Sequence, residues 1–506
     1  MKKSLTFSLL LALGGACGDD DGGGVTPDPD MGTGVDMAMT DEGVTPETGT
    51  PETGTPDGGM ADPLVYAFES RFEAGESSIA YSGQTTRHTL LDDLTGEVIN
   101  LARSIEEGRP GFDTEESIRE ELQFFMDYSR DADGDTPLLL TGNLPIQQST
   151  YGEIGNGALT VKIAGEDGRD HEDFGNPDSG AFIGWNGATG YENTPLGYTT
   201  WMLDELARLG GIEADPEAPA RLGPNGETLP PTITENGLDL RQLLQKFLLG
   251  AIMFSQGADD YMDEGFDDNL AINGDPREGA PYSEIEHAWD EAFGYYGAPR
   301  NAHLYSDEEA ASKGGREDWQ GEHDTDANGS IDLASEYFFG AAVNAAKRDL
   351  DQTSGTVNLS EEVYNAFTEG RAILASGTTD AGALARLEVV RQQAILGWER
   401  VIAATAIHYV NVTLSDMENL GTDDYNLLEH AKHWGELKGF AFSFQFNPRS
   451  PITTGQFTEL HAVIGDAPFI DGADTTGAEA ARAALIRARD IMAAAYGFGD
   501  DDVENW

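Results

Sequence analysis

The chain has 506 residues, a formal net charge of −61 and a single cysteine. A surface this acidic repels nucleic acid and anionic lipid, so we expect neither as a partner. With one cysteine the chain can form no internal disulfide, and burial of apolar side chains has to stabilise the fold. The acidic residues are spread along the whole sequence, which favours adaptation to a salty medium over a dedicated cation-attracting region.

The first residues have the pattern of a secretory signal. Lys2 and Lys3 precede an apolar run, Leu5 to Leu13, that is too short to span a membrane. Small residues then lead into Cys17, and this arrangement resembles the lipobox of bacterial lipoproteins, whose cysteine carries the lipid. We therefore expect residues 1–17 to be a lipoprotein signal and Cys17 to be lipidated. Ordinary secretion with an unmodified cysteine is the alternative.

Residues 18–62 are predicted to form a disordered acidic tether. They are rich in Gly, Pro, Thr and acidic residues, and Thr45-Pro46-Glu47-Thr48-Gly49 repeats at once as Thr50-Pro51-Glu52-Thr53-Gly54. Such a segment has no apolar periodicity, so it stays solvated and extended. A lipid followed by this tether predicts a globule anchored in the cell envelope, on the periplasmic face of the outer membrane or on the cell surface.

The remaining chain exceeds the usual size of one hydrophobic core, so we expect two packed units. The prediction is a mainly α fold of two related helical bundles with long loops and at most a short hairpin. The first unit covers residues 63–280, with an extended segment at 77–85, and the second covers 281–506. In chain order, apolar periodicity predicts helices over 90–105, 115–128, 199–209, 238–255, 334–350, 360–377, 381–416, 423–442 and 477–496. Another helix is predicted to begin at Ser283. Loops are expected over 135–195 and 214–236, with a hairpin near 159–163.

Two segments have nearly the same pattern. His287 to Tyr295 and His433 to Phe440 both contain Trp-x-Glu-x-x-Gly-aromatic after a histidine. Each follows a very apolar predicted helix. A repeated, spaced pattern indicates internal duplication, which supports two related bundles.

Histidines and acids accompany both copies. Positions i and i+3 share a helix face, so His287 is placed beside Asp290, and His433 beside Glu436. Imidazoles and carboxylates on facing helices bind metals in helical bundles. The candidate ligands for iron, haem, zinc or a metal chelate are His287, Asp290, Glu291, His430, His433 and Glu436. The alternative is that these side chains form hydrogen-bonded pairs, while the tryptophans anchor the core and the glycines allow close packing.

A second constellation resembles a calcium loop. Asp324, Asp326 and Asn328 occupy the first, third and fifth positions of an EF-hand-type loop, with the required glycine at the sixth. The twelfth position is Ser335, and the expected glutamate comes one residue later. The candidate calcium ligands are Asp324, Asp326, Asn328, Ser330, Asp332 and Glu336. The alternative is an Asx-rich turn that caps a helix.

Motifs for catalysis are incomplete. The sequence has no phosphate-binding loop, no nucleophile elbow, no complete zinc-protease motif and no covalent haem-attachment motif. We therefore assign no catalytic residue, and a divergent metallopeptidase is the least favoured hypothesis.

Several stretches resemble a family of bacterial lipoproteins, the "domain of unknown function 4856" type, for which no activity is assigned. They are Tyr81 to Arg87, Lys246 to Gly250, His287 to Tyr295, Asp324 to Glu336 with Lys347 to Asp349, and His433 to Asn447. The organisation is also similar to imelysin-like proteins, which are duplicated helical bundles linked to iron uptake and carry Gly-x-His-x-x-Glu. Here Ala431 replaces the glycine of that motif.

The resemblance implies an envelope-anchored, non-catalytic lipoprotein that binds a metal, haem or a metal chelate and serves uptake with envelope partners. The first alternative is a calcium-stabilised surface interaction or scaffold protein without a small-molecule site. The second alternative is the metallopeptidase-like protein.

Overall fold

The computed structural model describes residues 65–139, 145–166, 182–264, 266, 272–312, 324–352, 355 and 357–506. Within these ranges the chain is mainly helical, with isolated β-bridges and no longer strand. This confirms the predicted mainly α fold. The signal, Cys17 and the tether lie outside the described residues. No helix in the described part has both the length and the apolar character needed to cross a membrane.

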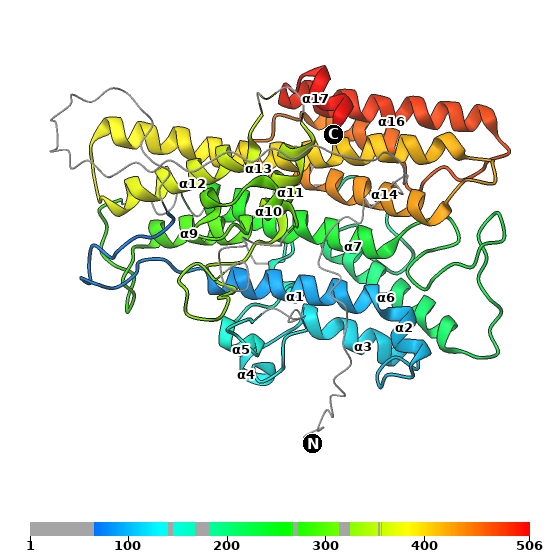
Figure 1. Ribbon diagram of the computed structural model, residues 1–506, viewed down its shortest axis with the longest axis horizontal. Helices are drawn as coiled ribbons and strands as arrows, with labels where there is room; N and C mark the ends of the chain where they lie inside the picture. The colour runs from blue at the N-terminus through cyan, green and yellow to red at the C-terminus, as the bar shows by residue number, and fades with distance from the viewer. Residues whose placement is uncertain are drawn as a thin grey trace, which may run out of the picture.

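The N-terminal helices form the lower layer in Figure 1. Contacts between α1 and α3 and between α3 and α6 hold this layer together. Its elements are α1 (Ser82–Ile99), α2 (Leu101–Glu106), α3 (Glu115–Met126), α4 (Arg130–Asp133), α5 (Tyr151–Ile154) and α6 (Pro195–Ala214).

A buried helix occupies the middle of the molecule. It begins as α7 (Leu240–Leu248) and continues as π-helical turns over Leu249–Phe254 and Gln256–Glu264. Its first part packs on α14 (Leu427–Ala441) and its last part on α9 (Glu284–Tyr296), so it separates the two copies of the repeated segment. The prediction of a central apolar helix here is consistent with its burial.

The long helix α13 (Ala381–Asp416) runs across the upper part of Figure 1, as the continuous apolar pattern predicts. It packs on α12 (Leu359–Ala375), α14 and α16 (Thr475–Tyr496). The remaining helices of this side are α10 (Asp307–Ser312), α11 (Gly340–Asp351), α15 (Thr454–Ile464) and α17 (Asp500–Asn505).

Two local predictions are wrong. The hairpin expected near 159–163 is a 3-10 turn, Thr160–Lys162, and the extended segment at 77–85 gives way to α1 at Ser82. The first residues of α1 are polar yet buried, so apolar periodicity does not predict that the helix begins there. Its threonines compensate for burial by donating to carbonyls one turn earlier, as Thr89 Oγ1 does to Thr85 O at 2.9 Å.

The hydrophobic core is shared by the predicted units. One cluster of buried side chains includes Tyr66 near the start and Trp506 at the end, with residues from both sides of position 280. A much smaller cluster, described below, surrounds Leu427. The division into units at 280 therefore stays a prediction.

The repeated segments pack alike. A Cβ on Gly294 of α9 would lie 2.7 Å from Cβ of Tyr81, the residue before α1, and one on Gly439 of α14 would lie 2.6 Å from Lys246 Cβ of α7. Both tryptophan side chains donate to a carbonyl of a neighbouring segment, Trp289 to Phe367 O and Trp434 to Ile464 O. The tryptophans and glycines thus serve packing.

A buried carboxyl in α13 makes stability depend on pH. Glu399 is fully buried and accepts a hydrogen bond from Asn447 Nδ2 at 2.7 Å. Burial raises its pKa from 4.5 to about 7. The folded state therefore holds this proton more tightly than the unfolded chain, so stability falls as the pH rises from about 4.5 to 7.

We expect Glu399→Gln to match the wild type at pH ~5 and to be more stable by about 3 kcal/mol at pH ~8, because glutamine never ionises in the core. Denaturant unfolding at both pH values measures this difference. The exposed Glu120→Gln is the control, and it should leave the pH dependence as in the wild type. An equal stability change at both pH values for Glu399→Gln would disprove the account.

Candidate metal centre

Three carboxylates meet in the loop that precedes α11. Ligand oxygens of Asp324, Asp326 and Glu336 all lie within 4.8 Å of one another. Among the described residues, this is the one group of three or more His, Cys, Asp or Glu side chains placed to hold a metal ion. All three were predicted as calcium ligands from the sequence.

The backbone of the loop folds around its first aspartate. Asp324 accepts the N–H groups of Asn328 and Gly329 at 3.0 and 2.9 Å. The chain makes this sharp turn because Ala327 and Gly329 are left-handed, with φ of 58° and 100°. A glycine at this sixth position is what an EF-hand-type loop requires.

The displaced glutamate returns into the loop. Glu336 Oε1 accepts the N–H of Thr325 at 2.7 Å, and its Oε2 accepts the N–H of Asp332 at 2.8 Å. Ser335, at the usual position of the glutamate, instead donates its hydroxyl to Asp332 Oδ2 at 2.6 Å. Glu336 comes one residue later than the glutamate of an EF-hand-type loop, yet its carboxylate still lies beside those of Asp324 and Asp326.

The other predicted calcium ligands lie in the same loop but have internal partners. Asn328 Oδ1 accepts the N–H of Ser330 at 2.9 Å. Asp332 Oδ1 accepts from Gln148 Nε2 at 2.6 Å. The structure thus brings three of the six candidates together and uses Asn328, Ser330 and Asp332 to shape the loop.

The loop also joins distant parts of the chain. Ile331 N–H donates to Pro145 O, and Gln147 N–H donates to Ile331 O, both at 2.8 Å. Arg300, just after α9, donates its N–H to Ser335 O at 2.8 Å. Rigidity in the loop would therefore be transmitted to residues 145–148 and to the end of α9.

Charge and burial at this centre fit a cation. Asp324 is 1% and Glu336 3% exposed, and within the described part of the chain neither carboxylate has an ion pair with Lys or Arg. Buried carboxylates need compensation, which backbone N–H groups supply only in part. Hard carboxylate oxygens in a loop are the donors that Ca²⁺ prefers.

Asp290 in the first repeated segment belongs to a buried structural network. It accepts from Arg371 Nε at 2.8 Å and from Tyr66 OH at 2.7 Å. Arg371 also pairs with Glu286 at 3.1 Å, and all three charged side chains are at most 1% exposed. The structure gives Asp290 the role of a hydrogen-bonded ion-pair partner.

His287 and Glu291 form a pair on α9, with Nε2 and Oε2 3.5 Å apart. Glu291 also accepts from Gln84 Nε2 of α1 at 2.9 Å, and the His287 ring stacks on Tyr282. Gln84 lies in the stretch Tyr81 to Arg87 that resembles the lipoprotein family. That resemblance is the one feature of the sequence that draws attention to Gln84.

The second copy holds a larger polar group. His433 Nδ1 lies 2.7 Å from Asp416 Oδ2 of α13, and its Nε2 lies 3.8 Å from Glu429. Burial lowers the pKa of His433, but the hydrogen bond and charge of Asp416 outweigh it, so the pKa is raised overall. Glu436 accepts from Tyr409 OH at 3.1 Å and lies 3.5 Å from Lys246 Nζ.

His430 points to a different partner. Its Nδ1 lies 2.8 Å from Tyr425 OH, and burial lowers its pKa to about 4, so the imidazole is neutral at pH 7. Figure 1 shows α9 and α14 toward opposite ends of the molecule. The histidines of the two copies therefore have separate surroundings, and spacing along the sequence gave no sign of Asp416 or Tyr409 as their partners.

Residues 226–461 match the model of the family described as "Domain of unknown function (DUF4856)". The similarity to that family extends over this segment. The resemblance expected from the sequence is confirmed over these residues, and the DUF4856 segment contains the loop with its three carboxylates and both repeated helices. No curated protein and no solved structure matches the chain.

Proposed function

We propose that this protein is a non-catalytic, calcium-stabilised helical lipoprotein that acts as an interaction or scaffold protein in the cell envelope. The observation that carries the proposal is the meeting of Asp324, Asp326 and Glu336 within 4.8 Å. The proposed location in the envelope comes from the expected lipid at Cys17 and the expected tether over 18–62. Both rest on the sequence pattern alone.

Calcium would act here through stability. An ion held by these carboxylates binds the folded loop and not the unfolded chain, so binding free energy becomes folding free energy. The loop is hydrogen-bonded to residues 145–148 and to Arg300, so the ion would also fix the path of the chain between α9 and α11. An ion that stiffens a loop in this way suits a protein that presents a rigid surface to a partner better than it suits an enzyme.

Thermal unfolding with calcium and with EDTA tests this role. Calcium at about 100 times its dissociation constant should stabilise the protein by about 2.7 kcal/mol, so EDTA should lower the melting temperature by several degrees. Magnesium should replace calcium poorly, because it demands a stricter octahedral shell. Identical melting temperatures with and without EDTA would reject the calcium role.

Binding of a transition metal or metal chelate at the second repeated segment is a second candidate. The observation that favours it is the position of His433 between two carboxylates, Asp416 and Glu429. We expect zinc or iron, if taken up at this place, to bind the wild type and to lose affinity in His433→Ala. Calorimetry that gives equal zinc and iron binding in both proteins would rule this candidate out.

A further inference from the structure

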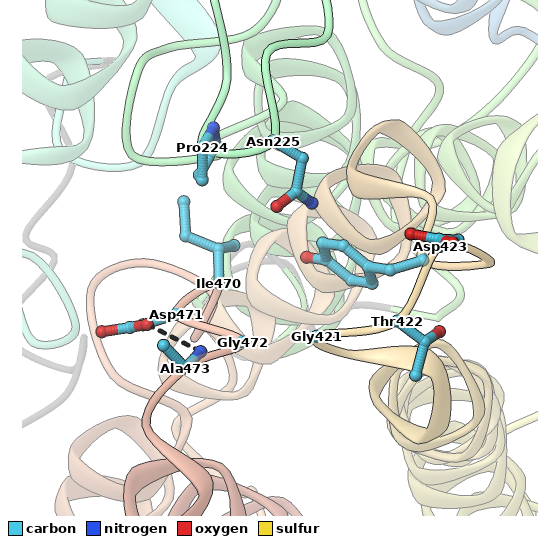
Figure 2. A pocket seen from close by; sticks show the side chains of 10 residues that line it. Pro224, Asn225, Gly421, Thr422, Asp423, Ile470, Asp471, Gly472 and Ala473 are labelled. Carbon is cyan, nitrogen blue, oxygen red and sulfur yellow. Dashed lines mark hydrogen bonds between the residues drawn. The ribbon is translucent and has the colours of Figure 1, made fainter.

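A polar surface cavity lies beside the second repeated helix. Three segments far apart in the sequence enclose it, the turn at 224–225, the loop at 421–425 and the loop at 470–473, and its volume is about 780 Å³. Figure 2 shows the labelled side chains of these segments around the hollow. The volume is in the usual range for small-molecule sites, roughly 300–1,000 Å³.

Apolar and polar side chains both line the cavity. Tyr425 and Ile470 line it, and both pack against the small hydrophobic cluster that contains Leu427, separate from the main core. The polar lining residues include Asn225, Thr422, Asp423 and Asp471. Ligand sites usually combine apolar lining residues with a small number of polar groups.

The position of the Tyr425 ring is fixed by a buried histidine. Tyr425 OH is hydrogen-bonded to His430 Nδ1 at 2.8 Å, and the two rings meet edge to face. His430 is fully buried, and its Nε2 has no hydrogen-bond partner among the described residues. A buried imidazole kept for this one contact fixes the Tyr425 ring, which lowers the entropy lost when a ligand stacks on it.

The loops of the cavity are also fixed to each other. A Cβ on Gly421 would lie 2.5 Å from Gly472 O, so the two backbones meet where only glycine fits. Asp471 Oδ1 accepts the N–H of Ala473 at 3.0 Å, drawn as the dashed line in Figure 2. The cavity is therefore built before any ligand arrives.

The lining selects the class of ligand by charge. Among the described residues, no Lys or Arg lines the cavity, while Asp423 and Asp471 do, so an anionic ligand is disfavoured. A quaternary ammonium ligand is recognised by several aromatic faces, and in the described part of the chain Tyr425 is the one aromatic lining residue. Carboxylate, amide and hydroxyl groups together both accept and donate hydrogen bonds, which suits hydroxyl groups on a neutral ligand.

We propose that this cavity binds a neutral sugar. The apolar face of a sugar ring would lie on Tyr425, and its hydroxyl groups would donate to Asp423 and Asp471 and exchange hydrogen bonds with Asn225. A free sugar and the end of a glycan present the same chemistry, and the site would take either. This binding does not depend on the calcium role proposed above.

Ligand-observed NMR with the full chain tests the proposal, using glucose, galactose, mannose, N-acetylglucosamine and their disaccharides as probes. At least one probe should bind, and Tyr425→Ala and Asp423→Ala should each weaken it by about tenfold. Tyr425→Phe keeps the ring and should retain binding within about threefold. Asp490→Ala, an exposed aspartate toward the other end of α16, is the matched control and should bind as the wild type does.

Three results would overturn the proposal. They are the absence of binding by every sugar, binding of choline or spermidine in place of sugars, and sugar binding that Asp423→Ala leaves unchanged. If Tyr425→Ala does not fold, as judged by its melting curve, Asp423→Ala and Tyr425→Phe decide the question. A disaccharide that binds while its monosaccharides do not would assign the site to a glycan.

Discussion

Arg371→Met is expected to lower the free energy of unfolding by about 3–5 kcal/mol. The guanidinium lies between Asp290 and Glu286 in the core and also donates to Ser78 Oγ at 2.8 Å. Its removal takes the ion-pair partner from the buried Asp290 and leaves the buried Glu286 with Arg71 alone, 3.6 Å away. This uncompensated burial is the source of the loss. Denaturant unfolding followed by circular dichroism measures it.

Arg386→Met is the matched control for this change. Arg386 pairs with Glu369 at 2.6 Å, but both side chains are more than 40% exposed, so water compensates when the pair is broken. Exposed pairs contribute about 0–1 kcal/mol. Equal losses in Arg371→Met and Arg386→Met would contradict the assignment of the Asp290 network to stability.

Glu336→Gln and Asp324→Ala are expected to abolish stabilisation by calcium. Each removes one of the three carboxylates, and a calcium site depends strongly on the charge of its ligands. Each variant should unfold at the same temperature in calcium as in EDTA, whereas the wild type should gain about 2–3 kcal/mol at saturating calcium. Thermal unfolding of each variant with and without EDTA gives the comparison.

Asp131→Asn is the control for the calcium variants. Asp131 is an exposed aspartate in another acidic segment, Asp131 to Asp135, which does not gather three carboxylates. It should keep the full response to calcium. A calcium response that survives in Glu336→Gln but disappears in Asp131→Asn would place the ion elsewhere.

The helical fold was predictable where apolar periodicity is continuous. The long pattern over 381–416 gives α13 with the same bounds, because one helix buries a mostly apolar stripe from Leu387 to Thr413. The start of α1 was missed because buried threonines and His88 replace apolar residues there, and their hydrogen bonds are made only in the folded helix. α17 has six residues, so it offers too few turns for a period to emerge.

The candidate site was predictable where chemistry is local in sequence. The calcium-type loop is such a case, and even its late Glu336 could be placed, because all its ligands lie within one loop. The partners of the repeated helices could not be found in this way. Arg371 is 81 residues from Asp290, so only the packing of α12 on α9 brings them together.

Calorimetric titration of the calcium-free protein with calcium measures binding at the loop. We expect one calcium ion bound per chain, at a site lost in Asp324→Ala and in Glu336→Gln and retained in Asp131→Asn. No binding in the wild type, or binding that both loop variants retain, would contradict it.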